Sequence, residues 1–290
     1  MIFDIKMDFT RKARFVAGGR TTENPASTTY SSVVSRDSVR IAFMFAALND
    51  LDMLAADVGN ASLNADCREK IWTIAGPEFG LKAGTVMIIK KALYSLKTSG
   101  AAWRALLASL LTDLGYESTR ADPDVWICAA VKPDGFEYYE MLLVYVDDIF
   151  VIAFDAKLTM DAIGKLYRLK DGSVGPPERY LGANIKRVQL PNGTMAWSIG
   201  ADEYVNKVLA TVKATLESEG MKLKGKASKP LPNGCRPDLD VSPECNAVMT
   251  QRYQRYLGIL CWALESCCID SVLEVSLTSS FNALQREGHL

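Results

Sequence analysis

The stretch Met141–Phe154 constrains the fold of this chain more than any other part of its sequence. Two adjacent acids, Asp147 and Asp148, separate apolar and β-branched residues that are typical of buried strands. The pattern predicts strands over Tyr138–Val146 and Ile149–Phe154. A hairpin turning at Asp147-Asp148 would explain the acids, because aspartate is common in turns. Short hairpin turns, however, favour Asn-Gly or Asp-Gly, and this stretch has no glycine.

A bound cation is a second explanation for the same two acids. Adjacent carboxylates near an apolar core repel each other and raise each other's pKa unless a cation compensates, and Mg²⁺ prefers carboxylate oxygen. A third acid, Asp57, ends the apolar strand expected at Leu51–Ala56. Alone, Asp57 suits a turn or a helix cap. Together with Asp147 and Asp148 it could hold two Mg²⁺ ions about 4 Å apart, as in-line phosphoryl transfer requires.

The composition excludes several classes of protein and several kinds of catalytic chemistry. The chain has 290 residues, 49% of them hydrophobic, and a net charge of −1, which excludes disordered and collagen-like chains and suits one or two globular domains. No apolar run reaches the roughly 18 residues of a membrane span, and no signal peptide is visible, so we expect an intracellular protein without a membrane partner. Seven cysteines form no Cys-x-x-Cys pair, and His289 is the single histidine. Catalysis must therefore depend on carboxylates, lysines, hydroxyls or bound ions.

Helices and strands are both predicted along the chain. Apolar residues at helical spacing predict helices at Ala101–Leu114, Ser38–Leu48 (capped by Ser35 or Asp37), Asp202–Leu216, near Tyr256–Leu264 and at Ser271–Leu284. Six further strands are expected at Leu51–Ala56, Ile71–Ile74, Thr85–Ile89, Val125–Val131, Tyr180–Val188 and Met195–Ile199. Asn192-Gly193 indicates a hairpin turn, and the proline-rich segment Lys226–Pro243 a linker. The elements do not alternate strictly, which favours an α+β fold.

Several motifs resemble one known family. Tyr145-Val146-Asp147-Asp148 resembles the Tyr-x-Asp-Asp box of reverse transcriptases. Further segments, in order over residues 12 to about 188, resemble the copia-type (Pseudoviridae) retrotransposon polymerase. These segments are Lys12–Gly19, Tyr30–Val34, Asp57–Asn64, Ala92–Lys97 with Ala102-Trp103 after it, Ala121-Asp122-Pro123 and Tyr180-Leu181-Gly182.

The resemblance implies a right-hand polymerase of fingers, palm and thumb, whose palm is an antiparallel sheet backed by helices. Fingers and palm would occupy residues 1–199, a thumb-like helix and basic loop 200–232, and a helical connection-like segment 233–290, truncated before any RNase H domain. The implied activity is RNA-directed DNA synthesis. Two Mg²⁺ ions, with Mn²⁺ as a possible substitute, would support transfer of dNTPs to a primer on an RNA or DNA template. The implied setting is a larger polyprotein with RNase H and integrase, in a cytoplasmic virus-like particle; the sequence leaves the oligomeric state open.

The resemblance also implies residue roles. The catalytic, metal-binding carboxylates would be Asp57, Asp147 and Asp148, and Lys170 would protonate pyrophosphate. The nucleotide would be bound by Lys12, Arg14, Ser62, Tyr94, Ser95 and Lys97. Primer and template would be contacted by Tyr145, Tyr180, Leu181, Gly182, Lys222, Lys224 and Lys226. The last three belong to a basic run that, on charge alone, favours a solvated face or loop.

Two positions depart from the family pattern. Ser62 replaces the aromatic residue that excludes a 2′-hydroxyl, so we expect weaker discrimination against ribonucleotides or a degraded element. Ser95 replaces a glycine, at a cost of about 1 kcal/mol if the backbone φ is positive. A catalytically decayed relic that folds and binds nucleic acid is therefore an alternative. An unrelated α+β domain with an acidic hairpin is another. Only the number of ordered motif matches argues against it, and a structure tests it, because the three carboxyl groups of a polymerase must converge.

Overall fold

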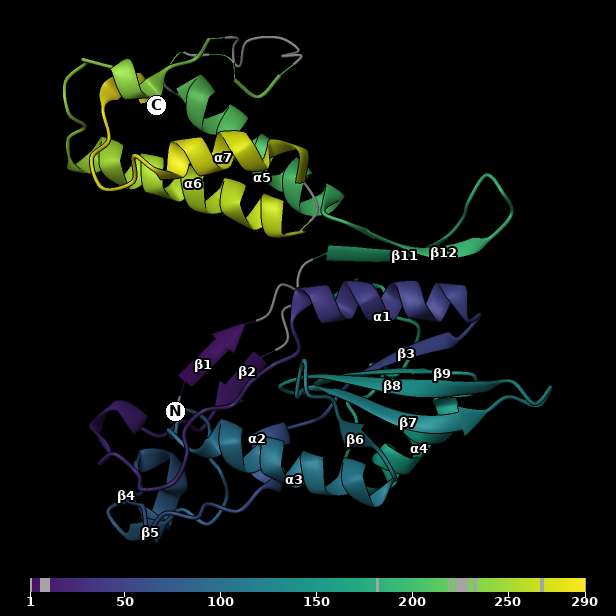
Figure 1. The fold of residues 1–290 in the computed structure, drawn as a ribbon. Coiled ribbons are helices and arrows are strands. Elements are labelled where there is room, and N and C mark those ends of the chain that lie inside the picture. Colours follow the sequence, from purple (N-terminus) through teal and green to yellow (C-terminus); the bar gives the residue numbers. More distant parts are fainter. Residues whose placement is uncertain are drawn as a thin grey trace. The chain divides into compact units, whose positions relative to one another are not determined.

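The computed structural model describes residues 2–5, 11–180, 183–218, 220, 222, 229–231, 234–266 and 269–289. The chain divides into two compact units, Met1–Pro177 and Glu178–Leu290, each of which contains helices and antiparallel strands (Figure 1). This agrees with the expected mixture of helices and antiparallel sheet. The division into fingers and palm, thumb and connection-like segment stays a prediction.

A five-stranded antiparallel sheet, in the order β3-β9-β8-β7-β6, forms the centre of the first unit. Its strands are β3 (Asp52–Asp57), β6 (Glu117–Ser118), β7 (Val125–Val131), β8 (Glu137–Tyr145) and β9 (Asp148–Ala153). Its helices are α1 (Arg36–Leu48), α2 (Ala61–Asn64), α3 (Ser99–Asp113) and α4 (Ala156–Leu166), with 3₁₀ turns at Gly19–Thr21 and Pro77–Lys82. Two small hairpins pair β1 (Ile2–Ile5) with β2 (Arg11–Arg14), and β4 (Trp72–Ile74) with β5 (Val86–Ile88).

Helices cover both faces of this sheet, with α1 on one side and α3 and α4 on the other (Figure 1). The Phe43 ring of α1 packs edge-on against Phe150 of β9, with ring centroids 6.3 Å apart. On the opposite face, Ile149 and Val151 belong to the core that includes α3 and α4. Since β9 is buried on both faces, all its residues after Asp148 are apolar instead of alternating with polar ones.

Helices α3 and α4 both pack into the core on one face of the sheet, but only α3 was predicted from the sequence. Trp103, Leu107 and Leu111 of α3 are almost fully buried, as the periodicity at Ala101–Leu114 predicted. Helix α4 was not predicted. Its signal was present, because Asp155 caps its first turn by accepting a hydrogen bond from the Leu158 amide, and Ala156, Met160 and Ile163 recur at helical spacing.

The second unit combines a three-stranded sheet, β10 (Arg179–Tyr180), β11 (Ala183–Gln189) and β12 (Met195–Gly200), with helices α5 (Asp202–Ser218), α6 (Ala247–Ser266) and α7 (Val272–Ser279). Short 3₁₀ turns span Pro237–Leu239, Ile269–Ser271 and Glu287–His289. Tyr253, Leu257 and Val275 form the small core between α6 and α7. The turn predicted at Asn192-Gly193 joins β11 to β12, and Gly193 has a φ of 85°.

Most predicted elements match the structure to within a few residues. The strand Val125–Val131 is confirmed at both ends, and Ser35 caps α1 by accepting a hydrogen bond from the Ser38 amide at 3.1 Å. The last helix is shorter than the predicted Ser271–Leu284. The linker expected at Lys226–Pro243 lies partly outside the described residues. Within the described part of the chain, no helix has the length and apolar character needed to cross a membrane.

Candidate active site

The β8–β9 hairpin carries two of the predicted acids. Tyr145 and Asp148 are register partners, so Val146 and Asp147 alone form the turn. The turn therefore lies one residue earlier than the Asp147-Asp148 turn that we considered from the sequence, and Asp148 is the first residue of β9. Val146 has a φ of 58°, a left-handed conformation that a β-branched residue rarely adopts.

The third acid lies at the adjoining end of β3. Asp57, the last residue of that strand, is the register partner of Asp148. The next residue continues the contact, because the Val58 amide donates a hydrogen bond to the Asp147 carbonyl at 2.8 Å. The backbone thus holds the end of β3 against both acidic residues of the hairpin.

This grouping of charge affects the carboxyl group of Asp148. Burial, followed by the charges of Asp147 and Asp57, raises the pKa of Asp148 to about 6, while the charge of Lys170 opposes the shift. Asp57 Oδ1 is buried and has no hydrogen-bond partner among the described residues. The site therefore has an excess of negative charge and an oxygen free to bind a cation.

Lys170 lies in contact with Asp57. Its ammonium group forms an ion pair with Asp57 Oδ2, and its amide donates a hydrogen bond to the Asp57 carbonyl at 2.9 Å. The Gly59 amide donates a hydrogen bond to the Arg168 carbonyl at 2.8 Å, so the backbone after β3 is bonded at two points to the segment that carries Lys170. Lys170 therefore belongs to the acidic site, although its predicted role in protonating pyrophosphate stays a prediction.

The three acids and Lys170 differ in geometry and in chemistry as candidates for a divalent metal site. In the described part of the chain, no three or more His, Cys, Asp or Glu side chains are grouped so as to hold a metal ion, so the three acids do not form such a group. Their chemistry nevertheless suits one. When all are ionised, three carboxylates and one lysine give −3 + 1 = −2, and carboxylate oxygens are what Mg²⁺ prefers. The metal assignment stays a prediction.

The predicted nucleotide-pocket residues Tyr94, Ser95 and Lys97 lie in one loop. This loop contacts the segment that follows β2, where the Ala17 amide donates to the Tyr94 carbonyl at 2.9 Å. Lys97 donates to the Thr22 carbonyl at 2.8 Å and to the Asn24 side chain at 2.9 Å. The ammonium group of Lys97 is therefore engaged within the protein.

Ser95 adopts the conformation on which its predicted cost depends. Its φ is 70°, so serine occupies a left-handed position that favours glycine. Gly19 packs against it so closely that a Cβ added at Gly19 would lie 1.8 Å from the Ser95 carbonyl oxygen. Residues of the same motif, Phe15 to Gly18, line a cavity of about 340 Å³ together with β4.

The remaining nucleotide-binding candidates lie on separate elements. Arg14 is exposed on β2, and Lys12 precedes it on the same strand, where it is the partner of Asp4. The Lys12 side chain lies outside the described part of the structure. Ser62 lies half-buried in α2, three residues before the Ala65 amide that bonds to its carbonyl at 3.1 Å.

The predicted primer and template contacts are only partly described. Tyr145 ends β8, and Tyr180 is buried in β10 of the second unit. Lys222 is exposed. The other four candidates, Leu181, Gly182, Lys224 and Lys226, lie outside the described residues.

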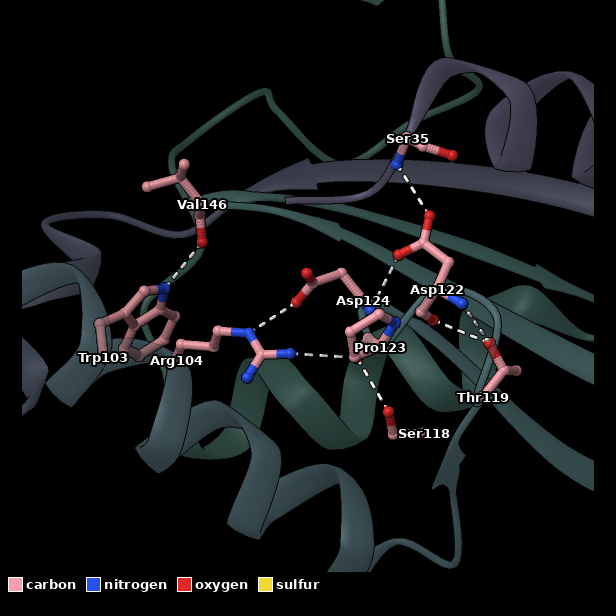
Figure 2. A network of polar contacts seen from close by, with 9 residues as sticks. All are labelled: Ser35, Trp103, Arg104, Ser118, Thr119, Asp122, Pro123, Asp124 and Val146. Atoms are coloured by element: carbon pink, nitrogen blue, oxygen red, sulfur yellow. Dashed lines mark hydrogen bonds and ion pairs between the residues drawn. The ribbon is translucent and has the colours of Figure 1, made fainter. Parts of the chain in front are cut away.

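The sequence predicted no role at the site for two neighbouring residues of α3. Trp103 contacts the acidic hairpin, and Arg104 contacts Asp124, the residue before β7. The Trp103 indole donates a hydrogen bond to the Val146 carbonyl at 2.7 Å, and the neighbouring Arg104 forms an ion pair with buried Asp124 at 2.8 Å (Figure 2). The sequence contained a signal for Trp103, because Ala102-Trp103 follows the Ala92–Lys97 motif in the family pattern. Its partner could not be identified from spacing alone.

An antiparallel sheet backed by helices, with two acids opposed at adjoining strand ends, defines an α+β protein with an acidic cluster at one end of its sheet. Comparison with known sequences identifies the family. The family model described as "Reverse transcriptase (RNA-dependent DNA polymerase)" matches residues 2–221, more than half of the chain. The chain therefore belongs to the reverse transcriptase (RNA-dependent DNA polymerase) family.

Curated relatives support the same conclusion. The chain is 30% identical over 186 residues to the retrovirus-related Pol polyprotein from transposon TNT 1-94 of Nicotiana tabacum, covering 62% of this chain and 13% of that protein. It is 26% identical over 231 residues to the transposon Ty1-DR1 Gag-Pol polyprotein of Saccharomyces cerevisiae, covering 77% and 12%. These relatives confirm the predicted copia-type resemblance. The chain spans about an eighth of their length, and no solved structure matches it.

Proposed function

We propose that this chain is the RNA-directed DNA polymerase domain of a copia-type retrotransposon, which transfers nucleotides from dNTPs to the 3′-hydroxyl of a primer. The observation that supports it most directly is the pairing of Asp57 with Asp148 beside the turn that carries Asp147. The family to which the chain belongs is described as RNA-dependent DNA polymerases, and this supports a catalytic role for the three acids. The fingers, palm and thumb division belongs to the same proposal.

The carboxylates of Asp57, Asp147 and Asp148 would hold two Mg²⁺ ions. Bound there, these supply a Lewis acid that lowers the pKa of the primer hydroxyl and neutralises the leaving pyrophosphate. Burial and the neighbouring acids raise the pKa of Asp148, so a compensating cation would favour its ionised form. The buried Oδ1 of Asp57, which has no partner among the described residues, supports the same role.

The chain's own cations would act on the triphosphate. Arg14 is exposed on β2 and free to approach a ligand from solution, and Lys12 lies on the same strand. Fixed positive charge at the triphosphate stabilises the charge that develops on the leaving group. Lys170, already beside Asp57, would transfer a proton to the pyrophosphate when its ion pair opens.

The partners follow from the same assignment. We propose an RNA or DNA template with its primer, and dNTPs, as substrates. The basic residues near Lys222 would bind duplex phosphates without reading sequence. Two relatives from Saccharomyces cerevisiae, of the transposons Ty1-DR1 and Ty1-A, are named Gag-Pol polyproteins, which favours a place for this chain in a larger polyprotein. Synthesis inside a cytoplasmic particle is part of the same proposal.

Primer extension on poly(rA)/oligo(dT) with Mg²⁺ or Mn²⁺ tests the proposal, with Asp147→Asn as the matched control. Asparagine keeps the size of the turn residue and removes one carboxylate. We expect extension by the wild-type chain and at least a hundredfold less by the variant. Extension no greater than that of Asp147→Asn would reject polymerase activity for this chain.

A non-catalytic relic that still folds and binds nucleic acid is the second candidate. The strained Ser95, with its φ of 70°, and Ser62 in place of an aromatic residue favour it. This candidate predicts binding of a labelled primer–template without extension. Binding weakened by added salt, as phosphate contacts require, would support it if extension fails.

A further inference from the structure

The turn that carries Asp147 is held in an unfavourable backbone conformation. Val146 has a φ of 58°, and a β-branched side chain in this region clashes with the backbone. Such strain persists only when the surroundings enforce it. The turn therefore needs a contact that makes this conformation the preferred one.

Trp103 supplies such a contact. Its indole Nε1 donates a hydrogen bond to the Val146 carbonyl oxygen at 2.7 Å (Figure 2). The donor is itself rigid, because Trp103 is only 2% exposed and packs edge-on against Tyr167 with ring centroids 5.1 Å apart. A hydrogen bond from a fixed, buried donor favours one position of the carbonyl it meets.

The helix that carries Trp103 is anchored to the same hairpin by the next residue. Arg104 Nε donates to Asp124 Oδ1 at 2.8 Å (Figure 2). The Asp124 carbonyl in turn accepts a hydrogen bond from the Val144 amide of β8 at 3.0 Å. Asp124 is buried, so this link is shielded from water. Consecutive side chains of α3 thus fix the helix against both the strand and the turn.

We propose that Trp103 is a positioning residue for the acidic site: its indole N–H holds the left-handed conformation of Val146, and so places Asp147 and Asp148. This inference deepens the proposed polymerase function and rests on it for its effect on catalysis. Its structural half can be tested separately. The Val58 amide bonds to the Asp147 carbonyl, so hydrogen exchange at Val58 reports whether the turn keeps its place.

The experiment compares Trp103→Phe with Trp126→Phe, the same substitution in the same core. Both remove an indole, but Trp103 is the one that bonds to the turn. We expect Trp103→Phe to lower kcat about tenfold or more while changing the KM for dNTP less than about twofold, because misplaced catalytic groups reduce the rate of the chemical step. Val58 should exchange faster in this variant and not in Trp126→Phe.

A second experiment removes the backbone strain at Val146. Glycine adopts a positive φ without clash, so in a Val146→Gly background the Trp103→Phe substitution should cost much less than in the wild type. If phenylalanine unfolds the protein, benzothienylalanine at position 103 keeps the shape of the indole without its N–H. Equal costs in the two backgrounds, or unchanged Val58 exchange, would overturn the inference.

The outcomes also separate this inference from the proposed function. A wild-type chain that extends no primer rejects the polymerase proposal, and Val58 exchange then decides alone whether Trp103 positions the turn. A wild-type chain that extends primers, with Trp103→Phe no slower than Trp126→Phe, rejects the positioning role and leaves the polymerase proposal intact.

Discussion

Asp57 and Asp148 face each other as register partners at the adjoining ends of β3 and β9. Two acids are opposed here, whereas cross-strand charge pairs that stabilise a sheet have opposite signs. The ion pair between Lys170 and Asp57 compensates for part of this repulsion. The remaining repulsion therefore destabilises the fold and leaves an anionic cluster at this end of the sheet.

The raised pKa of Asp148 leads to a pH-dependent prediction. Its ordinary value is 3.8 and its folded value about 6, so the folded state binds this proton more tightly and the free energy of unfolding falls as pH rises between these values. Asp148→Asn should therefore stabilise the protein by about 1–2 kcal/mol above pH 6, allowing for partial solvent exposure, and by little below pH 4. Urea unfolding at pH 4 and pH 7.5 measures this. An equal effect at both values would contradict it.

Ser95→Gly should stabilise the chain. Glycine has no Cβ and so is not strained at a φ of 70°. The relief of strain outweighs the entropic cost of a more flexible unfolded chain, and the free energy of unfolding should rise by up to about 1 kcal/mol. Ser95→Ala is the control, because it removes the hydroxyl but keeps the strained backbone. Urea unfolding compares the two, and a glycine variant no more stable than the alanine variant would refute the strain.

Gly19→Ala should destabilise the same loop. The added Cβ would lie 1.8 Å from the Ser95 carbonyl oxygen, which forces the backbone apart at a cost of about 1–3 kcal/mol. Gly175→Ala is the matched control, since its Cβ would meet nothing within 4 Å. Thermal unfolding of both variants tests the prediction, which fails if the two melt together.

Arg104→Met should destabilise the first unit by about 3 kcal/mol, because it leaves the carboxylate of Asp124 buried without its charge partner. The side chain of Asp124 is 2% exposed, and its Oδ2 already has no hydrogen-bond partner among the described residues. Arg40→Met removes an exposed pair with Asp37 and should cost less than about 1 kcal/mol. Similar losses in urea unfolding would show that burial of Asp124 does not govern the effect.

Ser62→Tyr should increase discrimination against ribonucleotides, if the polymerase proposal holds. By the family resemblance, an aromatic ring at this position would fill the space of a 2′-hydroxyl, so we expect rNTP incorporation relative to dNTP to fall at least about tenfold. Ser62→Ala removes the hydroxyl without adding a ring and should leave the ratio nearly unchanged. An unaltered ratio in the tyrosine variant would reject the idea.

The sequence alone determined those features that depend on neighbouring residues. The strand Val125–Val131, the Ser35 cap and the turn at Asn192-Gly193 follow from side-chain size, hydrogen-bonding capacity and backbone freedom within a few positions. The acids at the ends of predicted strands also stood out in the sequence, and their catalytic role stays a prediction. Helix α4 was not predicted, although its short apolar stripe and the Asp155 cap are local signals of the same kind.

Tertiary structure decided which distant residues meet. Backbone pairing of β3 with β9 places Asp57 opposite Asp148, and the hydrogen bond from the Lys170 amide to the Asp57 carbonyl brings the Lys170 ammonium group to Asp57. The same packing sets the Trp103 indole against the Val146 carbonyl. Nothing in the local sequence encodes these contacts. They arise because burying apolar surface fixes the helices and strands in one arrangement, and polar groups then pair with whatever that arrangement brings near them.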